Sequence, residues 1–371
     1  MPSVPTFIAR RIAPRAEVAA PGGRARRRRG ALAALAVALL LAAIACAAVG
    51  GVSIRAASVV AMLAHALGLG VDAAPWTPQQ AAVLFAIRLP RVALAALVGA
   101  GLGVSGAAMQ GVFRNPLVDP GLLGVSSGAA LGAVASIVVG ARFAHGLPAW
   151  MAPYALSLAA FGGGLVAMVA VERVATVGGR TAVATLLLAG IAVNALAGAL
   201  TGLCTYLADD AQLRTLTFWS LGSLGGATWR VVLGAAPFIV LPTLALPRLS
   251  RPLNAMLLGD AQAKHLGFDA ERVKRGVMVA VALIVGASVA VSGVLGFVGL
   301  VVPHVVRLAT GPDHRLVLPG SALLGAILLL LADAVSRTAV LPAELPLGVV
   351  TACLGTPFFL ALLLKERRRL A

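Results

Sequence analysis

Residues 88–133 read RLPRVALAALVGAGLGVSGAAMQGVFRNPLVDPGLLGVSSGAALGA. Two apolar stretches rich in glycine and alanine flank a polar segment, residues 114–121, that is broken by Pro116 and Pro120. Every unpaired backbone N–H or C=O in lipid costs several kcal/mol, so this segment must be buried in protein or line a water-filled path. The stretch therefore predicts two membrane-spanning helices joined by a hinge, an arrangement typical of a transport pore.

The composition indicates that the rest of the chain also lies in a membrane. Hydrophobic residues make up 60% of the 371 residues and charged residues 12%, whereas soluble domains average about 45–50% apolar and about 25% charged. A spanning helix needs about 20 apolar residues, so the chain has room for about ten. We expect an all-α polytopic membrane protein.

Charged residues predict the topology. We expect spans at about residues 30–51, 88–112, 122–140, 151–171, 182–207, 229–247, 275–300, 303–311, 317–336 and 346–364. The net charge of +17 fits loops that are basic on the cytoplasmic side. This predicts a disordered basic tail over 1–29, a membrane domain over 30–365 and a tail over 366–371, with both termini cytoplasmic. The stretch 303–311 is too short to cross alone, so we expect a partial helix.

Three arginines oppose this orientation. Arg88 and Arg91 open the second span at its outer end, and Arg337 closes the ninth span at its outer end. Helix-end arginines can reach water by snorkelling, which is one interpretation. The other is a basic outer platform that binds an acidic partner or an anionic substrate. Asp333 stands four residues before Arg337, so these two are expected to pair on one helix face.

The loop over residues 254–275 is the longest polar stretch within the membrane domain. Apolar residues such as Leu257, Leu266 and Phe268 alternate with charges, and Gly259 and Gly267 interrupt the run. The pattern predicts two short amphipathic helices joined by a turn, which would suit docking by another protein. The alternative is a solvated connection.

Motifs for chemistry are absent from the sequence. It contains no G-x-x-x-x-G-K-[ST] phosphate loop, no H-E-x-x-H and no nucleophile elbow. The five histidines and three cysteines are scattered without ligand spacing, so we expect no catalytic residue, no cofactor and no metal site. An ion-coupled secondary transporter is a rival class, although acids within the spans are scarce; a membrane enzyme lacks any reactive constellation.

Ordered motifs over residues 80–365 resemble the FecCD/BtuC-like permease family of binding-protein-dependent type II ABC importers, which carry iron chelates, haem and cobalamin. The motifs are RLPR (88–91), SGAAMQ (105–110), RNPLVDPG (114–121), LLLAG (186–190), GD…LG (259–267), GFVGLVVPH (296–304), GPDHR (311–315) and ELPLG (344–348). The segment 218–229, FWSLGSLGGATW, looks most like the haem-importing branch.

The resemblance implies a ten-helix subunit that forms a homodimer in the bacterial inner membrane. Haem is the implied substrate, with a ferric siderophore or cobalamin as the alternative. Two cytoplasmic ATPase subunits would hydrolyse ATP, and a periplasmic binding protein would deliver the substrate; no nucleic acid is expected.

The same resemblance implies roles for individual residues. Arg88, Arg91 and Arg337 would dock the binding protein. Asn115 and Leu117, with Val183 and Ala184, would form the cytoplasmic gate, although relatives carry hydroxylated residues at the last two positions. The residues implied to couple to the ATPase are Leu258, Gly259, Asp260, Ala263, Lys264, Leu266 and Gly267.

Overall fold

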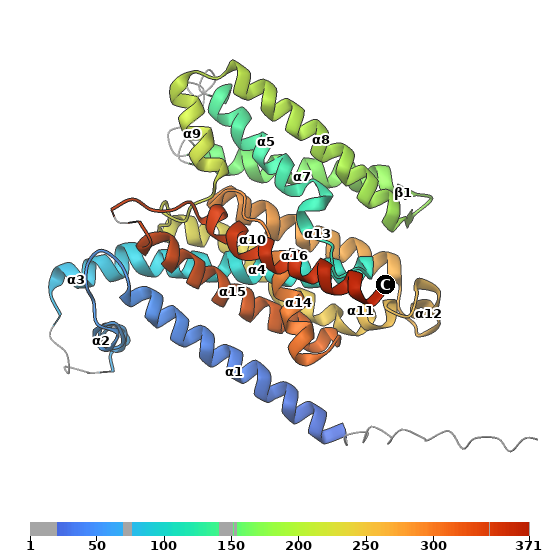
Figure 1. Cartoon of the computed structure of the whole chain (residues 1–371), viewed down its shortest axis with the longest axis horizontal. Coiled ribbons are helices and arrows are strands. Elements are labelled where there is room, and N and C mark those ends of the chain that lie inside the picture. The colour runs from blue at the N-terminus through green and yellow to red at the C-terminus, as the bar shows by residue number, and fades with distance from the viewer. Residues whose placement is uncertain (1–20, 70–75, 141–150, 152–153, 341, 371) are drawn as a thin grey trace, which may run out of the picture.

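The computed structural model describes the chain except for residues 1–20, 70–75, 141–150, 152–153, 341 and 371 (Figure 1). Ten helices occupy the positions of the ten predicted spans. They are α1 (Pro21–Ala48), α4 (Leu89–Phe113), α5 (Val125–Val138), α7 (Ala155–Ala175), α8 (Val183–Leu207), α10 (Trp229–Ala245), α13 (Ala270–Ser292), α14 (Val298–Thr310), α15 (His314–Thr338) and α16 (Leu347–Leu370). Within the described part, seven segments are long and apolar enough to cross a membrane, while α5, α14 and α16 provide shorter apolar stretches.

Shorter elements connect these helices. They are α2 (Ala56–Ala66), α3 (Pro78–Val83), the π-helix η1 (Leu84–Arg88), the 3-10 helix η2 (Pro120–Leu123), β1 (Thr176–Val177), β2 (Arg180–Thr181), α9 (Asp210–Ser220), the 3-10 helix η5 (Leu246–Leu249), α11 (Ser250–Met256) and α12 (Asp260–His265). The two strands pair as a short antiparallel hairpin between α7 and α8.

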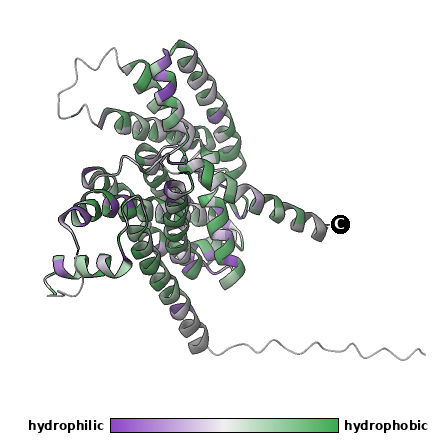
Figure 2. Ribbon diagram, turned by 60° about the vertical axis from the view of Figure 1, so that its left-hand side comes forward, coloured by the Kyte–Doolittle hydropathy of each residue, from purple (hydrophilic) through white to green (hydrophobic). Residues whose placement is uncertain are grey.

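Helix α4 forms the centre of the bundle. It is buried without interruption from Gly101 to Phe113, as expected for a helix that is apolar on every side. Helices α10, α13, α14 and α15 pack around it, while α5, α7, α8 and α9 form a second group and α1 lies against α15 (Figure 1). The hydropathy colouring shows hydrophobic residues along most of the helices (Figure 2).

Glycines allow α4 to approach its neighbours closely. A Cβ at Gly99 would overlap the carbonyl oxygen of Gly325 on α15, and a Cβ at Gly325 would overlap that of Gly99. A Cβ at Gly106 would likewise overlap the carbonyl oxygen of Gly299 on α14. Small residues at such crossings are typical of membrane helices, whose association depends on close van der Waals contact.

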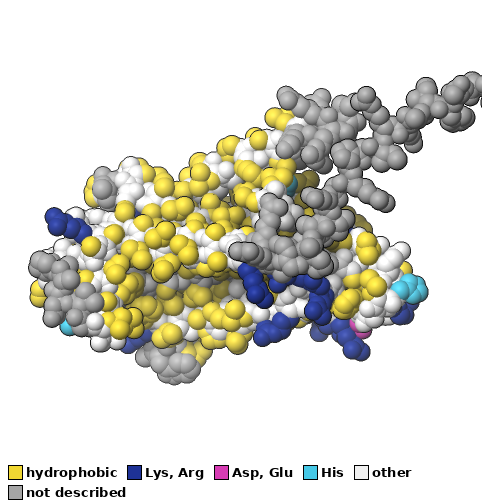
Figure 3. Space-filling model, turned by 90° about the horizontal axis from the view of Figure 1, so that it is seen from below, with side chains coloured by type: hydrophobic (Ala, Val, Ile, Leu, Met, Phe, Trp, Pro, Cys, Tyr) yellow, Lys and Arg dark blue, Asp and Glu magenta, His cyan; other side chains and the backbone are white. Residues whose placement is uncertain are grey.

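The two ends of the bundle differ in charge. Helices α11 and α12, the β1–β2 hairpin and the start of α1 lie at one end, whereas α2, α3 and α9 lie at the other (Figure 1). Most Lys and Arg side chains visible in Figure 3 gather toward the first of these ends, and a hydrophobic surface covers the middle. We refer to these as the basic end and the opposite end.

Three boundaries differ from the predictions. Helix α1 begins at Pro21, so residues 21–29 are helical rather than part of a disordered tail. Proline is favoured at the start of a helix, because the N–H group that it lacks would have no helical partner there. Helix α16 continues past residue 364, where its predicted span ended, to Leu370. The span predicted over 275–300 ends at Ser292, because Gly293 (φ 70°) and Phe297 (φ 67°) adopt left-handed conformations that a helix cannot contain.

Candidate functional site

The hinge after α4 is a turn fixed by its own side chains. Arg114 ends α4 with a left-handed backbone (φ 50°). The Asn115 side chain accepts a hydrogen bond of 2.9 Å from the Leu117 N–H, a local bond typical of Asx turns. Asn115 is exposed and Leu117 is half-buried. Both predicted gate residues of the hinge are therefore held at the surface of the basic end.

Gln110 anchors this hinge from inside the bundle. Its amide nitrogen lies 3.3 Å from the Val118 carbonyl oxygen and 3.4 Å from that of Gly299. Its amide oxygen accepts a hydrogen bond of 2.5 Å from Arg307 on α14. Gln110 stood within a family motif, but neither its role nor that of Arg307 was predicted, because the contacts with Gly299 and Arg307 join distant parts of the sequence.

The second predicted gate segment follows the β1–β2 hairpin. Gly178 (φ 58°) and Gly179 (φ 76°) form its turn, since two-residue hairpin turns favour positive φ at both positions. Helix α8 then begins at Val183, which is half-buried, and Ala184 is exposed. This segment lies at the basic end together with the hinge.

Of the two short helices predicted in the polar loop, α12 lies wholly within residues 254–275, whereas α11 begins before the loop, at Ser250, and only its last three residues fall inside it. Gly259 (φ 122°) separates them, and Gly267 (φ 84°) ends α12. The Phe268 N–H reaches the Ala263 carbonyl oxygen at 2.9 Å, and the Gly267 N–H reaches that of Lys264 at 2.9 Å, which is a Schellman cap. The loop is therefore a folded unit rather than an extended connection.

The predicted coupling residues divide between two faces of this unit. Ala263 is fully buried, and Asp260 pairs with Arg114 and with Lys274. Leu258 and Leu266 are 67% and 58% exposed; Lys264 and Gly267 are exposed as well, and Gly259 is half-buried. One face thus holds the unit to the bundle while the other presents apolar side chains outward.

Asn254 attaches α11 to the start of α15. Its amide nitrogen donates a hydrogen bond of 2.7 Å to Asp313, and its amide oxygen accepts one of 2.9 Å from the His314 N–H. Burial acts to raise the pKa of Asp313, but hydrogen bonds from the Arg315 N–H and from Asn254 prevail and lower it. Asp313 therefore stays ionised as the N-cap of α15.

The three arginines predicted at the outer edge lie together at the opposite end, but they are buried. Arg88, Arg91 and Arg337 are 4%, 8% and 8% exposed. A docking platform and snorkelling both require guanidinium groups in water, so neither describes their surroundings in this subunit. Their docking role stays a prediction.

Partners within the subunit explain this burial. Arg88 donates hydrogen bonds to the Ala47 and Ala48 carbonyl oxygens at 2.8 and 2.6 Å, at the end of α1 where helical carbonyls lack partners. Arg91 binds Asp333 at 2.9 Å and both carboxylate oxygens of Glu344 at 2.9 Å. Covered by these groups, the arginines join the ends of α1, α4 and α15.

Arg337 completes this set of contacts. It pairs with Asp333 at 3.0 Å, which confirms the expected four-residue pairing, and it donates hydrogen bonds of 3.0 Å to the Cys46 and Val49 carbonyl oxygens. We define the outer arginine cluster as Arg88, Arg91, Asp333, Arg337 and Glu344.

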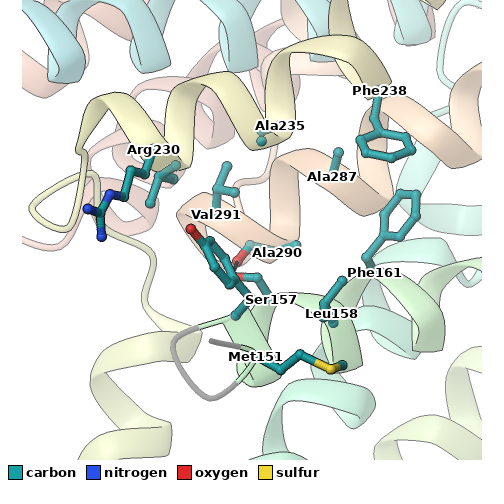
Figure 4. Close-up of a pocket in the computed structure, with 13 residues that line it drawn as sticks. Met151, Ser157, Leu158, Phe161, Arg230, Ala235, Phe238, Ala287, Ala290 and Val291 are labelled. Atoms are coloured by element: carbon teal, nitrogen blue, oxygen red, sulfur yellow. Dashed lines mark hydrogen bonds between the residues drawn. The ribbon is translucent and has the colours of Figure 1, made fainter. Parts of the chain in front are cut away.

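A cavity of about 350 Å³ lies between α7, α10 and α13 (Figure 4). Phe161 and Phe238 lie against each other at one side of it, with ring centroids 5.0 Å apart. Among the lining residues that the structure describes, Arg230 is the one charged side chain, and none is an acid or a histidine. Among the described residues, no group of three or more His, Cys, Asp or Glu is placed to hold a metal ion.

The sequence pattern of the FecCD transport family matches residues 35–365. The chain belongs to the FecCD transport family. It is 50% identical to the hemin transport system permease protein HmuU of Yersinia pestis over 284 residues, which cover 76% of this chain and 83% of that protein. It is 44% identical to a cobalamin import permease of Halobacterium salinarum over 77% of this chain and 74% of that protein. A vitamin B12 import permease of Escherichia coli is 43% identical over 79% of this chain and 87% of that protein.

A solved structure supports the same assignment. An inward-facing conformation of a metal-chelate type ABC transporter superposes with a TM-score of 0.77 and 31% identity, covering 90% of this chain and 98% of that one. This FecCD protein is therefore a multi-pass permease with the type II ABC importer fold, as predicted, and not the ion-coupled transporter considered as a rival.

Proposed function

We propose that this FecCD permease imports haem across the bacterial inner membrane as one of two identical subunits. Two separate ATPase subunits supply the energy, and a periplasmic binding protein delivers the haem. The observation that carries the substrate proposal is the 50% identity to a hemin permease, against 44% and 43% for the cobalamin permeases. The segment over residues 218–229 favours the same branch.

The folded loop at the basic end is the proposed ATPase contact. Leu258 and Leu266 expose apolar side chains on a unit that Ala263 and Asn254 hold against the bundle. The basic charge of this end favours the cytoplasmic side, where an ATPase would meet it. A capped helix pair can be moved as a rigid body, whereas an extended loop would absorb the motion.

The proposed path runs along α8, between this subunit and its copy. Helix α8 carries Gly198 and Gly202 four residues apart on one face. Both glycines are exposed in the single subunit, with open space where a Cβ would stand, and small residues at this spacing let a neighbouring helix approach closely. Asn115, Leu117, Val183 and Ala184 would close this path at the basic end.

The binding protein would dock at the opposite end. There the outer arginine cluster joins the ends of α1, α4 and α15 through buried contacts. Arg88, Arg91 and Arg337 would therefore act on docking by shaping the surface that the binding protein meets.

Growth tests decide the substrate. The permease, with the ATPase and binding protein of its own bacterium, is expressed in two strains that lack their own permease, one dependent on external haem and one dependent on external cobalamin. We expect growth of the haem-dependent strain alone. Growth of the cobalamin-dependent strain alone would assign cobalamin, and growth of neither, with protein present in the membrane, would refute both assignments.

A further inference from the structure

Lys274 on α13 is a buried cation whose three protons are all used. Its side chain is 3% exposed. The ammonium nitrogen lies 2.7 Å from an oxygen of Asp260, 2.9 Å from an oxygen of Glu271 and 3.2 Å from the Thr181 carbonyl oxygen. A lysine ammonium has three donors and no acceptor. Its position is therefore fixed from three directions.

The acids that bind Lys274 extend the contacts further. The second oxygen of Asp260 pairs with Arg114, and the second oxygen of Glu271 accepts a hydrogen bond of 2.8 Å from the Thr181 N–H. The five residues Arg114, Thr181, Asp260, Glu271 and Lys274 form a closed set of contacts, which we name the lysine junction.

The junction touches three segments to which the proposed function assigns motion. Arg114 directly precedes Asn115 in the hinge, and Thr181 lies two residues before Val183. Asp260 is the first residue of α12. One set of contacts thus connects the proposed ATPase-binding loop to both proposed gate segments.

Burial distinguishes Lys274 from an ordinary surface ion pair nearby, whereas the Arg114–Asp260 contact of the junction is partly open to water. Asp269 and Arg272 pair at 2.9 Å at the start of α13, but their side chains are 50% and 87% exposed, so their pairing contributes little. Lys274 has no such access to water. Removing one partner of a buried charge leaves the other uncompensated, which is strongly unfavourable, so segments joined through Lys274 move together.

We infer that the lysine junction transmits displacement of α12 to both gate segments, and that Lys274 is its positioning residue. The inference rests on the proposed function, because it requires an ATPase that moves α12. When α12 shifts, Asp260 pulls on Arg114 and on Lys274, and Lys274 in turn holds Thr181. The hinge and the start of α8 then change position in the same step.

The test uses the permease–ATPase complex in proteoliposomes with haem-loaded binding protein. The variants are Lys274→Met, Arg114→Gln and Asp260→Asn, and the control is Arg272→Gln. We expect haem transported per ATP to fall about fivefold or more in the three variants, the range of typical coupling energies, while the control keeps the wild-type ratio. A purely structural role would lower transport and hydrolysis together and leave their ratio unchanged.

The double variant Arg114→Gln with Asp260→Asn sharpens the test. Because Arg114 acts in the junction only through Asp260, the double variant should transport as much haem per ATP as Asp260→Asn alone. The Arg114 and Asp260 side chains are 39% and 40% exposed, so these variants carry the test even if Lys274→Met does not fold. A wild-type ratio in both single variants, or multiplied losses in the double variant, would overturn the inference.

A second readout separates this inference from the substrate proposal. Cysteines at position 117 of the two subunits should cross-link in one nucleotide state in wild type and equally in all states in the Asp260→Asn variant. This result requires no cargo, so haem transport can fail while the junction is upheld. Nucleotide-dependent cross-linking that survives in Asp260→Asn would refute the junction alone.

Discussion

Removing Arg91 is expected to destabilise the folded subunit rather than only weaken docking. Asp333 is buried, with its side chain 2% exposed, and its carboxylate binds Arg91 at 2.9 Å and Arg337 at 3.0 Å. Arg91→Met deletes the first of these partners and leaves the second. A hydrogen bond to a charged group contributes about 1.5–3 kcal/mol, so we expect the free energy of unfolding to fall by about this amount.

Three further variants give the expected order of effects. Glu344 binds the same arginine but its side chain is 44% exposed, so Glu344→Gln should cost about 0–1 kcal/mol. Arg91→Met with Arg337→Met removes both cations and leaves the Asp333 carboxylate buried without a counter-charge, which should cost at least about 3–5 kcal/mol. Adding Asp333→Leu to this double variant removes the unpaired charge and should recover part of the loss.

Thermal unfolding of the purified subunit in detergent measures this series. The account predicts stability in the order wild type, Glu344→Gln, Arg91→Met and the double variant, with partial recovery in the triple variant. Equal melting temperatures for wild type and Arg91→Met, combined with lost capture of the binding protein, would refute the structural role. That result would restore these arginines to a direct docking role.

Three other predictions follow from the loop, the hinge and the core. Leu258→Asp with Leu266→Asp should abolish co-purification of the ATPase. Leu67→Asp, which changes an exposed leucine directly after α2, should not, and equal loss in both would indicate misfolding. Leu117→Cys should cross-link between two subunits in one nucleotide state and not in another, and cross-linking independent of nucleotide would remove Leu117 from the gate. Gly106→Ala should cost about 1–3 kcal/mol, because its Cβ would overlap the Gly299 carbonyl oxygen, whereas Gly162→Ala has open space; similar melting temperatures would contradict the packing.

Local patterns were sufficient to predict most of the fold. Apolar runs predicted the positions of all ten helices, although the run over 303–311, now within α14, was too short to cross a membrane alone. The Asn115–Pro116 step predicted the turn after α4, because helical backbone is disfavoured at the residue before proline. Gly259 and Gly267 marked the ends of the short helices in the loop, where their positive φ values are found. These features depend on residues that are neighbours in the sequence, so they could be predicted without knowing the tertiary structure.

Features that depend on distant residues were not predictable in this way. The orientation signal singled out Arg88, Arg91 and Arg337, but not their burial. Carbonyl groups at the end of α1 cover Arg88 and Arg337, and Asp333 and Glu344 cover Arg91. The span over 275–300 was drawn too long, since its apolar run hides the turn that Gly293 and Phe297 make. The burial and contacts of Lys274 were not predicted, because its partners Thr181 and Asp260 come from other segments of the sequence.

The central claim is that this FecCD permease couples ATP hydrolysis to haem import, and transport in proteoliposomes tests it most directly. The permease–ATPase complex is reconstituted, haem-loaded binding protein is added on one side and ATP on the other, and accumulated haem is measured against phosphate released. We expect haem to accumulate only when both ATP and the haem-loaded binding protein are present. With an equal concentration of cobalamin-loaded binding protein, we expect no accumulation of cobalamin. ATP hydrolysis stimulated by the binding protein without any haem accumulation, or haem entry without ATP, would contradict it.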